Sequence, residues 1–147
     1  MTSLSQEERN TRTAVQYLQH IVDGSGQQGK PAFDQAFALV SDDFTIKVMP
    51  DAMKMPELRL ARYRRWLEPM VDQLFDTFEM KVIETTAQDN RVVVEATSSA
   101  RTKDGRPYGQ HYFIAFTFND RGQIAHVKEF VDSHYSVRFY GLPQEEV

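Results

Sequence analysis

Residues 91–131 read RVVVEATSSARTKDGRPYGQHYFIAFTFNDRGQIAHVKEFV. Apolar and polar side chains alternate through much of this stretch, and a period of two is typical of strands with one buried face. The alternation is interrupted at residues 103–106 and 119–122, where Asp, Asn and Gly supply the backbone angles that tight hairpins need. We therefore predict an antiparallel meander with strands at residues 91–102, 107–118 and 123–131.

Upstream of this stretch the same reasoning predicts two more strands. Residues 78–87 lead into the turn residues Gln88-Asp89-Asn90. Phe44, Ile46 and Val48 alternate with polar residues, and Pro50 ends that run.

Helical spacing of apolar residues marks the remaining segments. Ser5 and Glu8 have the spacing of a capping box, so a first helix should begin there and end before residues 24–26. Pro31 suits the first turn of a second helix, whose inner face would be Phe33, Phe37 and Val40. A third helix is expected at about residues 56–75, kinked or split by Pro69, and a short last one from residue 133.

The element order is helix, helix, strand, helix and then four strands, which predicts the α+β class. We expect a cone-shaped, curved antiparallel sheet with three helices packed on its concave face. Such a sheet leaves a cavity at one end that can enclose a ligand. One domain should span residues 1–147.

Composition excludes several classes of function. The net charge of −4 gives no positive field for nucleic acid or anionic lipid, and no apolar run reaches the length of a membrane span. The chain has no cysteine, no spacing typical of metal ligands and no dinucleotide or phosphate-binding motif. We therefore expect a cytoplasmic protein that uses neither a metal nor a cofactor.

Three segments near the C-terminus carry a family resemblance: Tyr108–Phe116, with the letters YGQHYFIAF, then Gly122-Gln123-Ile124, and then Lys128-Glu129-Phe130-Val131-Asp132. Together with the element order they resemble the nuclear transport factor 2-like superfamily, which includes ketosteroid isomerases and SnoaL-like polyketide cyclases. The resemblance covers nearly the whole chain. It implies a pocket for a small hydrophobic molecule, and a homodimer formed through the outer face of the sheet.

The ending Arg138-Phe139-Tyr140-Gly141-Leu142-Pro143 is similar to that of the phenazine-biosynthesis A/B proteins. In that subfamily a glutamate of the last strand and a histidine of the third helix act on the substrate. The glutamate corresponds to Glu129, whereas Tyr63 stands where the histidine would be. Ketosteroid isomerases place a general-base aspartate after a turn like Asp42-Asp43, but no carboxylate follows that turn here.

Glu129 is the strongest candidate for chemistry. It shares one side of its strand with Ala125, Val127 and Val131, and a carboxylate on an apolar face has its pKa raised toward neutrality, as an acid/base catalyst near pH 7 requires. The alternative is an exposed glutamate paired with Lys or Arg.

The other predicted catalytic residues are Tyr63 and His111, which would orient or polarise the substrate; either could instead be structural. Asp132 is expected to cap the last helix, and His126 to lie on the outer face. Predicted substrate contacts are Tyr17, Trp66, Tyr112, Phe116 and Val127, although core packing explains such aromatic residues equally well.

Two hypotheses follow. The first is a cofactor-free isomerase, dehydratase or cyclase that acts on a small hydrophobic or aromatic metabolite, with Glu129 as acid or base. The second is a non-catalytic ligand-binding or dimerisation module of the same fold, in which Glu129 is ion-paired and side chains fill the cavity.

Overall fold

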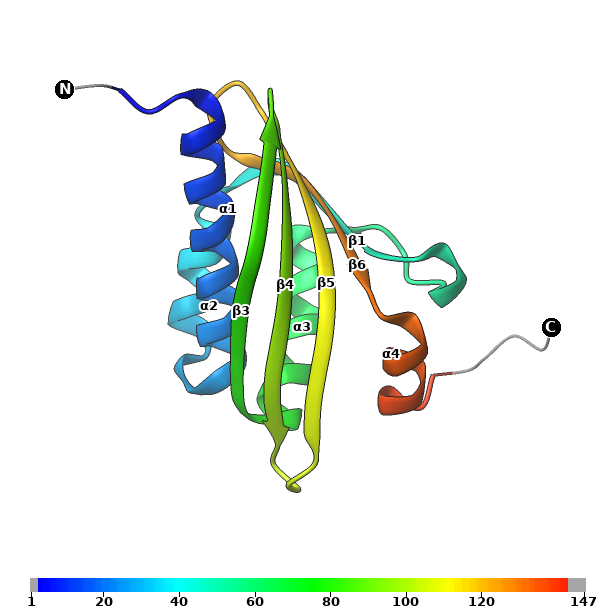
Figure 1. Cartoon of the computed structure of the whole chain (residues 1–147). Helices are drawn as coiled ribbons and strands as arrows, with labels where there is room; N and C mark the ends of the chain where they lie inside the picture. Colours follow the sequence, from blue (N-terminus) through cyan, green and yellow to red (C-terminus); the bar gives the residue numbers. More distant parts are fainter. Residues whose placement is uncertain (1–2, 143–147) are drawn as a thin grey trace.

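The computed structural model describes residues 3–142 (Figure 1). Its helices are α1 (Gln6–Asp23), α2 (Lys30–Phe37), α3 (Leu60–Leu74) and α4 (Ser133–Tyr140). Its strands are β1 (Val40–Met49), β2 (Leu58–Arg59), β3 (Phe75–Gln88), β4 (Arg91–Thr102), β5 (Pro107–Phe118) and β6 (Ile124–Val131). The α+β class is confirmed, with a fourth helix beyond the three expected against the concave face.

The strands form one six-stranded sheet in the order β2-β1-β6-β5-β4-β3. From β3 to β6 each strand pairs antiparallel with the next, as the hairpin turns predicted. The pair β1 and β6 is parallel and so differs from the expected antiparallel sheet. The two strands are far apart in the sequence, and no hairpin forces them to run in opposite directions.

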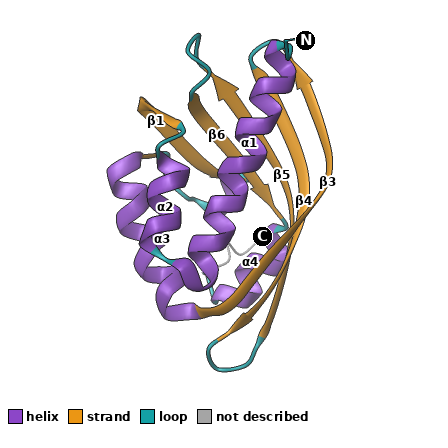
Figure 2. Cartoon of the chain, turned by 90° about the vertical axis from the view of Figure 1, so that its left-hand side faces the viewer, coloured by secondary structure: helices purple, strands orange, loops and turns teal. Residues whose placement is uncertain are grey.

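Helices α1, α2 and α3 cover one face of the curved sheet (Figure 2). Alternation buries the inner side chains of β4 and β5 against them, among them Val92 and Val94 of β4 and Ile114 and Phe116 of β5. Residues at the intervening positions point to the other face, which we call the outer face. The sheet therefore has a core side and an outer side, defined strand by strand.

Capping residues determine where helices α1 and α4 begin and where α4 ends. Ser5 caps α1 by accepting a hydrogen bond from the backbone N–H of Glu8 at 3.1 Å. Asp132 caps α4 by accepting one from the N–H of Tyr135 at 3.1 Å, so the predicted cap is confirmed. Gly141 ends α4 with a φ of 67°, a left-handed conformation that suits glycine.

Several predicted boundaries were wrong. Helix α2 ends at Phe37, and Val40 lies in β1, where it pairs with Ile124 of β6. Helix α3 starts at Leu60 and runs past Pro69 without a break, because Leu67 and Val71 on either side are buried in the core. Tertiary packing there outweighs the missing backbone donor of proline. Among residues 3–142, no helix is long and apolar enough to cross a membrane.

Candidate functional site

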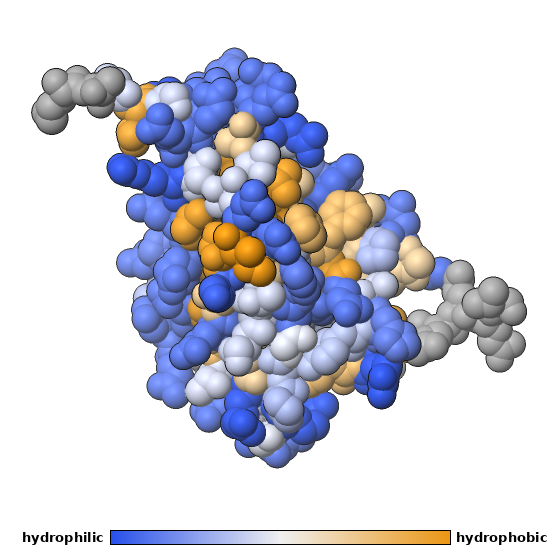
Figure 3. Space-filling model, in the orientation of Figure 1, coloured by the Kyte–Doolittle hydropathy of each residue, from blue (hydrophilic) through white to orange (hydrophobic). Residues whose placement is uncertain are grey.

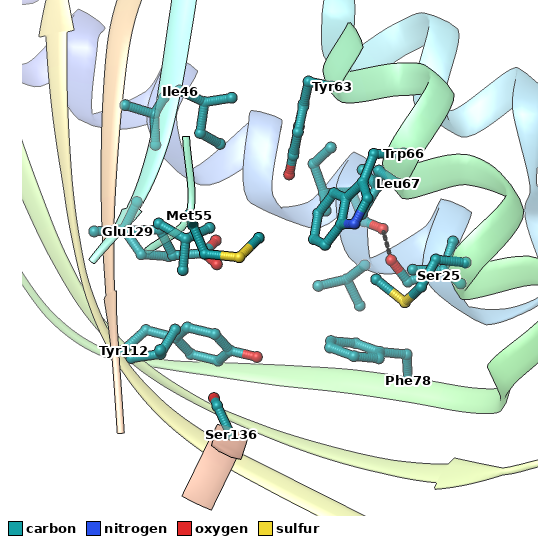
Figure 4. Close-up of a pocket in the computed structure, with 18 of the residues that line it drawn as sticks. Ser25, Ile46, Met55, Tyr63, Trp66, Leu67, Phe78, Tyr112, Glu129 and Ser136 are labelled. Atoms are coloured by element: carbon teal, nitrogen blue, oxygen red, sulfur yellow. Dashed lines mark hydrogen bonds between the residues drawn. The ribbon is translucent and has the colours of Figure 1, made fainter. Parts of the chain in front are cut away.

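A cavity of about 380 Å³ lies between the inner face of the sheet and helices α1, α3 and α4. Most of its lining is aliphatic, aromatic or methionine side chains (Figure 4). Trp66 of α3 and Tyr140 of α4 line it and are also 41% and 38% exposed, so they stand where the cavity meets solvent. Its size lies within the range of roughly 300–1,000 Å³ that is typical of small-molecule sites.

Glu129 reaches this cavity from the inner face of β6. It pairs in register with Val48 of β1 and with Ile114 of β5, and both of these side chains also line the cavity. Apolar neighbours on both sides withhold the water that would solvate a carboxylate. This desolvation raises the pKa of Glu129 from its ordinary value of 4.5 to about 7.

The described residues that line the cavity include no Lys, Arg or His. Lys47 and Lys128 lie one residue before Val48 and Glu129 on their strands, so alternation directs both lysines to the outer face. Lys47 makes its ion pair there, with Asp51 at 2.7 Å. Within the described chain Glu129 is therefore a carboxyl without a counter-cation.

Tyrosine hydroxyls surround the carboxyl. Tyr17 of α1 is 2% exposed, and its hydroxyl has no hydrogen-bond partner among the described residues. Burial, and then the charge of Glu129, raise the pKa of Tyr17 above its ordinary value. Burial is also the main cause that raises the pKa of Tyr63, followed by the charges of neighbouring groups that include Glu129. Both phenols therefore keep their protons and can act as hydrogen-bond donors.

The carboxyl of Glu129 and the hydroxyls of Tyr63 and Tyr112 point into the same space (Figure 4). Tyr112 is held in place because its hydroxyl is 2.9 Å from Ser98 Oγ, which also accepts a hydrogen bond from the N–H of Gln110. Tyr63 and Tyr17 lie on helices, and Glu129 and Tyr112 on adjacent strands. The sheet and the helices thus bring polar groups from four elements to one end of an apolar cavity.

A buried glutamine fixes helix α4 against the cavity. Gln110 of β5 donates to Ser136 Oγ at 2.7 Å and accepts from the N–H of Asp132 at 2.9 Å. The hydroxyl oxygen of Tyr135 of α4 accepts a hydrogen bond from the N–H of Gly109 at 3.0 Å.

 The hydrogen bonds of Tyr135 and Gln110 therefore hold α4 against β5. Ser136 and Tyr140 of this helix line the cavity.

The structure brings together most of the predicted site residues. The cavity is lined by Glu129, Tyr63, Tyr17, Trp66, Tyr112 and Val127. Phe116 does not line it: this residue is fully buried beside Tyr17, with ring centroids 5.8 Å apart. It has the same parity as Tyr112, and its register neighbour Val127 lines the cavity, but its own side chain packs into the core against Tyr17.

His111 lies away from the cavity, on the outer face. Its Nε2 is 2.7 Å from Glu95 Oε2, and its ring stacks on Phe113 with centroids 5.9 Å apart. Because Tyr112 points inward, its neighbour His111 must point outward. His126 also lies on the outer face, with Nδ1 2.6 Å from Thr45 Oγ1, as predicted.

Sequence reasoning did not select Tyr108 and Tyr140 as site residues, although both line the cavity. The parity of Tyr108 with Tyr112 on β5 is a signal that could have found the first. Tyr140 had no such signal, because its position depends on how α4 folds back over the sheet. The methionines Met53, Met55, Met70 and Met80 also line the cavity. Within the described residues, no three His, Asp or Glu side chains converge as a metal site would require.

Comparisons with known proteins agree with this architecture. The fold is similar to BvnE pinacolase from Penicillium brevicompactum, with 21% identity, coverage of 96% of this chain and 94% of that chain, and a TM-score of 0.80. It is also similar to PrhC from Penicillium brasilianum NBRC 6234, with 16% identity, coverage of 93% of this chain and 89% of that chain, and a TM-score of 0.78. An LEH-like epoxide hydrolase from M. tuberculosis is similar as well, with 18% identity, coverage of 95% of this chain and 89% of that chain, and a TM-score of 0.71. At these identities the likeness shows the fold alone.

A search of curated protein sequences gives no match. The sequence profile of the SnoaL-like domain matches residues 19–127, which is well over half of the chain. The chain belongs to the SnoaL-like domain family.

Proposed function

We propose that this protein is an acid/base enzyme that isomerises, dehydrates or cyclises a small hydrophobic or aromatic molecule without a cofactor. The observation that carries the proposal is Glu129, a carboxyl without a counter-cation at one end of an apolar cavity. With a pKa of about 7, this group is present in both its protonated and ionised forms near neutral pH. It can therefore accept a proton and return it in one catalytic cycle.

The chemistry is clearest for a substrate with a C–H bond next to a carbonyl. The Glu129 carboxylate takes the proton, the C–H electron pair forms a carbon–carbon double bond, and the carbonyl oxygen takes the negative charge. The unpartnered hydroxyl of Tyr17 would donate a hydrogen bond to that oxygen, with Tyr63 as a second donor. In a β,γ-unsaturated ketone the negative charge extends over the second double bond, so return of the proton to the γ carbon restores the carbonyl and completes an isomerisation. In a β-hydroxy ketone the enolate electrons restore the carbonyl and form the new carbon–carbon double bond as the hydroxyl departs, and delivery of the proton to that hydroxyl releases water and completes a dehydration.

A non-catalytic module of the same fold has less support. That hypothesis expects an ion-paired Glu129 and a cavity filled by side chains. Within the described residues the cavity lining holds no cation, and the cavity has a volume of about 380 Å³. The fold neighbours named as a pinacolase and an epoxide hydrolase indicate that the architecture accommodates catalysis in other proteins.

Exchange of carbon-bound hydrogen tests the proposal without knowledge of the natural substrate. A panel of small ketones is incubated with the protein in D₂O, and deuterium uptake next to the carbonyl is followed by mass spectrometry. We expect catalysed exchange that falls about 10²–10⁴-fold in Glu129→Gln. Glu95→Gln is the matched control and should exchange at the wild-type rate. Equal exchange in wild type and Glu129→Gln would contradict the assignment.

We also propose that two copies of the chain pair through the outer face. Phe113 and Phe130 are neighbours in register on β5 and β6 and are 50% and 41% exposed, and Ile83 of β3 is 49% exposed. Hydrophobic residues gather on the face turned to the viewer in Figure 3. Sedimentation equilibrium should give the mass of two chains, reduced toward one chain by Phe113→Ser. A wild-type mass of one chain would contradict the pairing.

A further inference from the structure

We propose that the cavity selects uncharged ligands with an acceptor oxygen, such as a ketone or an ether on an apolar skeleton, and rejects carboxylates and phosphates. This inference rests on the proposed function in that it assigns a substrate class to the same cavity. It narrows the expected ligands, because aromatic acids are excluded while neutral aromatic and alicyclic molecules remain.

The charges of the cavity lining disfavour an anionic ligand. The lining contributed by the described residues has one acidic group, Glu129, and no basic side chain. A carboxylate ligand would enter an apolar space without a cation to compensate the loss of its hydration, and beside a second carboxyl. Two carboxylates in one such site cannot both be ionised without a large cost, so binding would require an additional proton.

The hydrogen-bond donors of the cavity favour a ligand with an acceptor oxygen. The Tyr17 hydroxyl is buried without a partner, although buried polar groups are normally hydrogen-bonded. The Tyr63 hydroxyl points into the same space as the Glu129 carboxyl (Figure 4). Raised pKa values keep both phenols protonated, so a ligand oxygen that accepts hydrogen bonds would satisfy them.

A protonated amine is the competing ligand class, because aromatic rings and a carboxylate also suit a cation. An ammonium group, however, has no lone pair: it could donate to the Tyr17 oxygen but could not accept the hydroxyl proton of Tyr17. It would also require Glu129 to be fully ionised, which its surroundings disfavour. The donors therefore favour the neutral oxygen ligand over the amine.

The groups that face Glu129 determine how binding responds to pH. Strand β1 contributes only apolar side chains to this part of the lining, Ile46 and Val48. The other titratable groups whose charge is coupled to Glu129 are the phenols of Tyr17, Tyr63, Tyr108, Tyr112 and Tyr140. Burial raises the pKa of each above its ordinary value of 10.0, so Glu129 is the group among them that titrates near neutrality.

Three probes with one skeleton test the selection: 2-decalone, decahydro-2-naphthoic acid and 2-aminodecalin. The acid and the amine do not absorb where tryptophan does, and the ketone absorbs there only weakly, so binding can be followed by the fluorescence of Trp66, the one tryptophan of the chain, which lines the cavity. At pH 8 we expect the ketone to bind at least about tenfold more tightly than the acid or the amine. An acid or amine that binds as tightly as the ketone would overturn the proposal, as would a ketone that fails to saturate at about 1 mM.

The pH dependence of the acid supplies a second, independent readout. Because the acid must bind with a proton shared in the site, its affinity should fall about tenfold for each pH unit above 7. In Glu129→Gln this slope should disappear, while Glu95→Gln should retain it. An unchanged slope in Glu129→Gln would contradict the proposed role of the carboxyl in selection.

The two proposals fail separately. If the ketone is preferred but deuterium exchange is the same in wild type and Glu129→Gln, the ligand class stands and the acid/base function fails. If exchange depends on Glu129 but the acid binds as tightly as the ketone at pH 8, the function stands and the ligand class is overturned.

Discussion

Glu129 on β6 and Glu95 on β4 belong to the same sheet but lie on opposite faces of it. Glu95 is on the outer face, where its carboxylate is 2.7 Å from His111 Nε2 and water reaches both side chains. Glu129 is on the inner face, where its register neighbours are Val48 and Ile114. A carboxylate with a partner and solvent is a structural feature of a surface, whereas the same group without either acquires a pKa suited to proton transfer.

The largest contrast between the two faces should be in stability, and β5 offers a matched pair of phenylalanines. Phe116 is fully buried on the inner face, and Phe113 is 50% exposed on the outer face. We expect Phe116→Ala to lower the free energy of unfolding by about 3–5 kcal/mol, because it leaves a cavity in the core. Phe113→Ala should cost less than about 1 kcal/mol within a single chain, measured at a protein concentration too low for two copies to pair.

Urea denaturation at one fixed protein concentration measures both variants. Equal losses would mean that the two faces are not packed differently, and the contrast on which the site is built would be wrong.

The next largest effect is the change in stability with pH that Glu129, but not Glu95, should cause. A carboxyl whose pKa is higher in the folded state than in the unfolded chain binds a proton more tightly when folded. Its contribution to stability is present below pH 4.5 and is lost as the pH rises through about 7. Glu129→Gln removes this penalty and should raise the free energy of unfolding by about 2–3 kcal/mol at pH 8.

The gain should disappear as the pH falls below 4.5, where the wild-type carboxyl becomes protonated in both states. Thermal unfolding of both proteins across this pH range gives the two curves. Glu95→Gln should show no such gain at pH 8, and a Glu129→Gln protein that is less stable than wild type at pH 8 would refute the desolvation argument.

A smaller contrast concerns two tyrosines of the cavity. The Tyr17 hydroxyl has no partner among residues 3–142, so Tyr17→Phe should leave stability unchanged or raise it by up to about 1 kcal/mol. The Tyr112 hydroxyl bonds to Ser98 Oγ at 2.9 Å, and Tyr112→Phe should lower stability by about 1 kcal/mol. If Tyr17 donates to the substrate, Tyr17→Phe should still slow ketone exchange; a wild-type rate would remove Tyr17 from the mechanism.

The smallest effect is expected on the outer face. His111→Gln breaks the exposed pair with Glu95, and such pairs contribute about 1 kcal/mol or less. Unfolding in low and high salt should show a small loss that salt reduces further. Ketone exchange should be unchanged, since His111 is remote from the cavity; a marked fall would restore this residue as a catalytic candidate.

The strands of the meander could be predicted well because alternation and turn chemistry are local. The bounds expected for residues 91–102 and 107–118 are those of β4 and β5. The inward position of Glu129 also followed from alternation alone. Parity should likewise have separated His111 from Tyr112, because adjacent residues of one strand cannot both face the cavity.

Other features depend on contacts between distant segments. The parallel pairing of β1 with β6 has no local signal, since α3 and four further strands lie between them in the chain. Alternation predicts which face of the sheet a side chain lies on, but not whether it lines the cavity or packs in the core. Phe116 was therefore expected to contact the substrate, although it packs in the core against Tyr17. Tyr140 reaches the cavity because Gln110 holds α4 against β5, a contact that the sequence pattern does not reveal.

The central claim is that Glu129 is an unpaired carboxyl in an apolar cavity, and its titration tests this most directly. The side-chain carboxyl carbons of the glutamates can be followed by ¹³C NMR from pH 3 to pH 9, with Glu129→Gln identifying the resonance. The account predicts a midpoint at about 7 for Glu129. A midpoint near the ordinary value of 4.5 would show that the carboxyl is solvated or paired, and would contradict both the proposed chemistry and its physical basis.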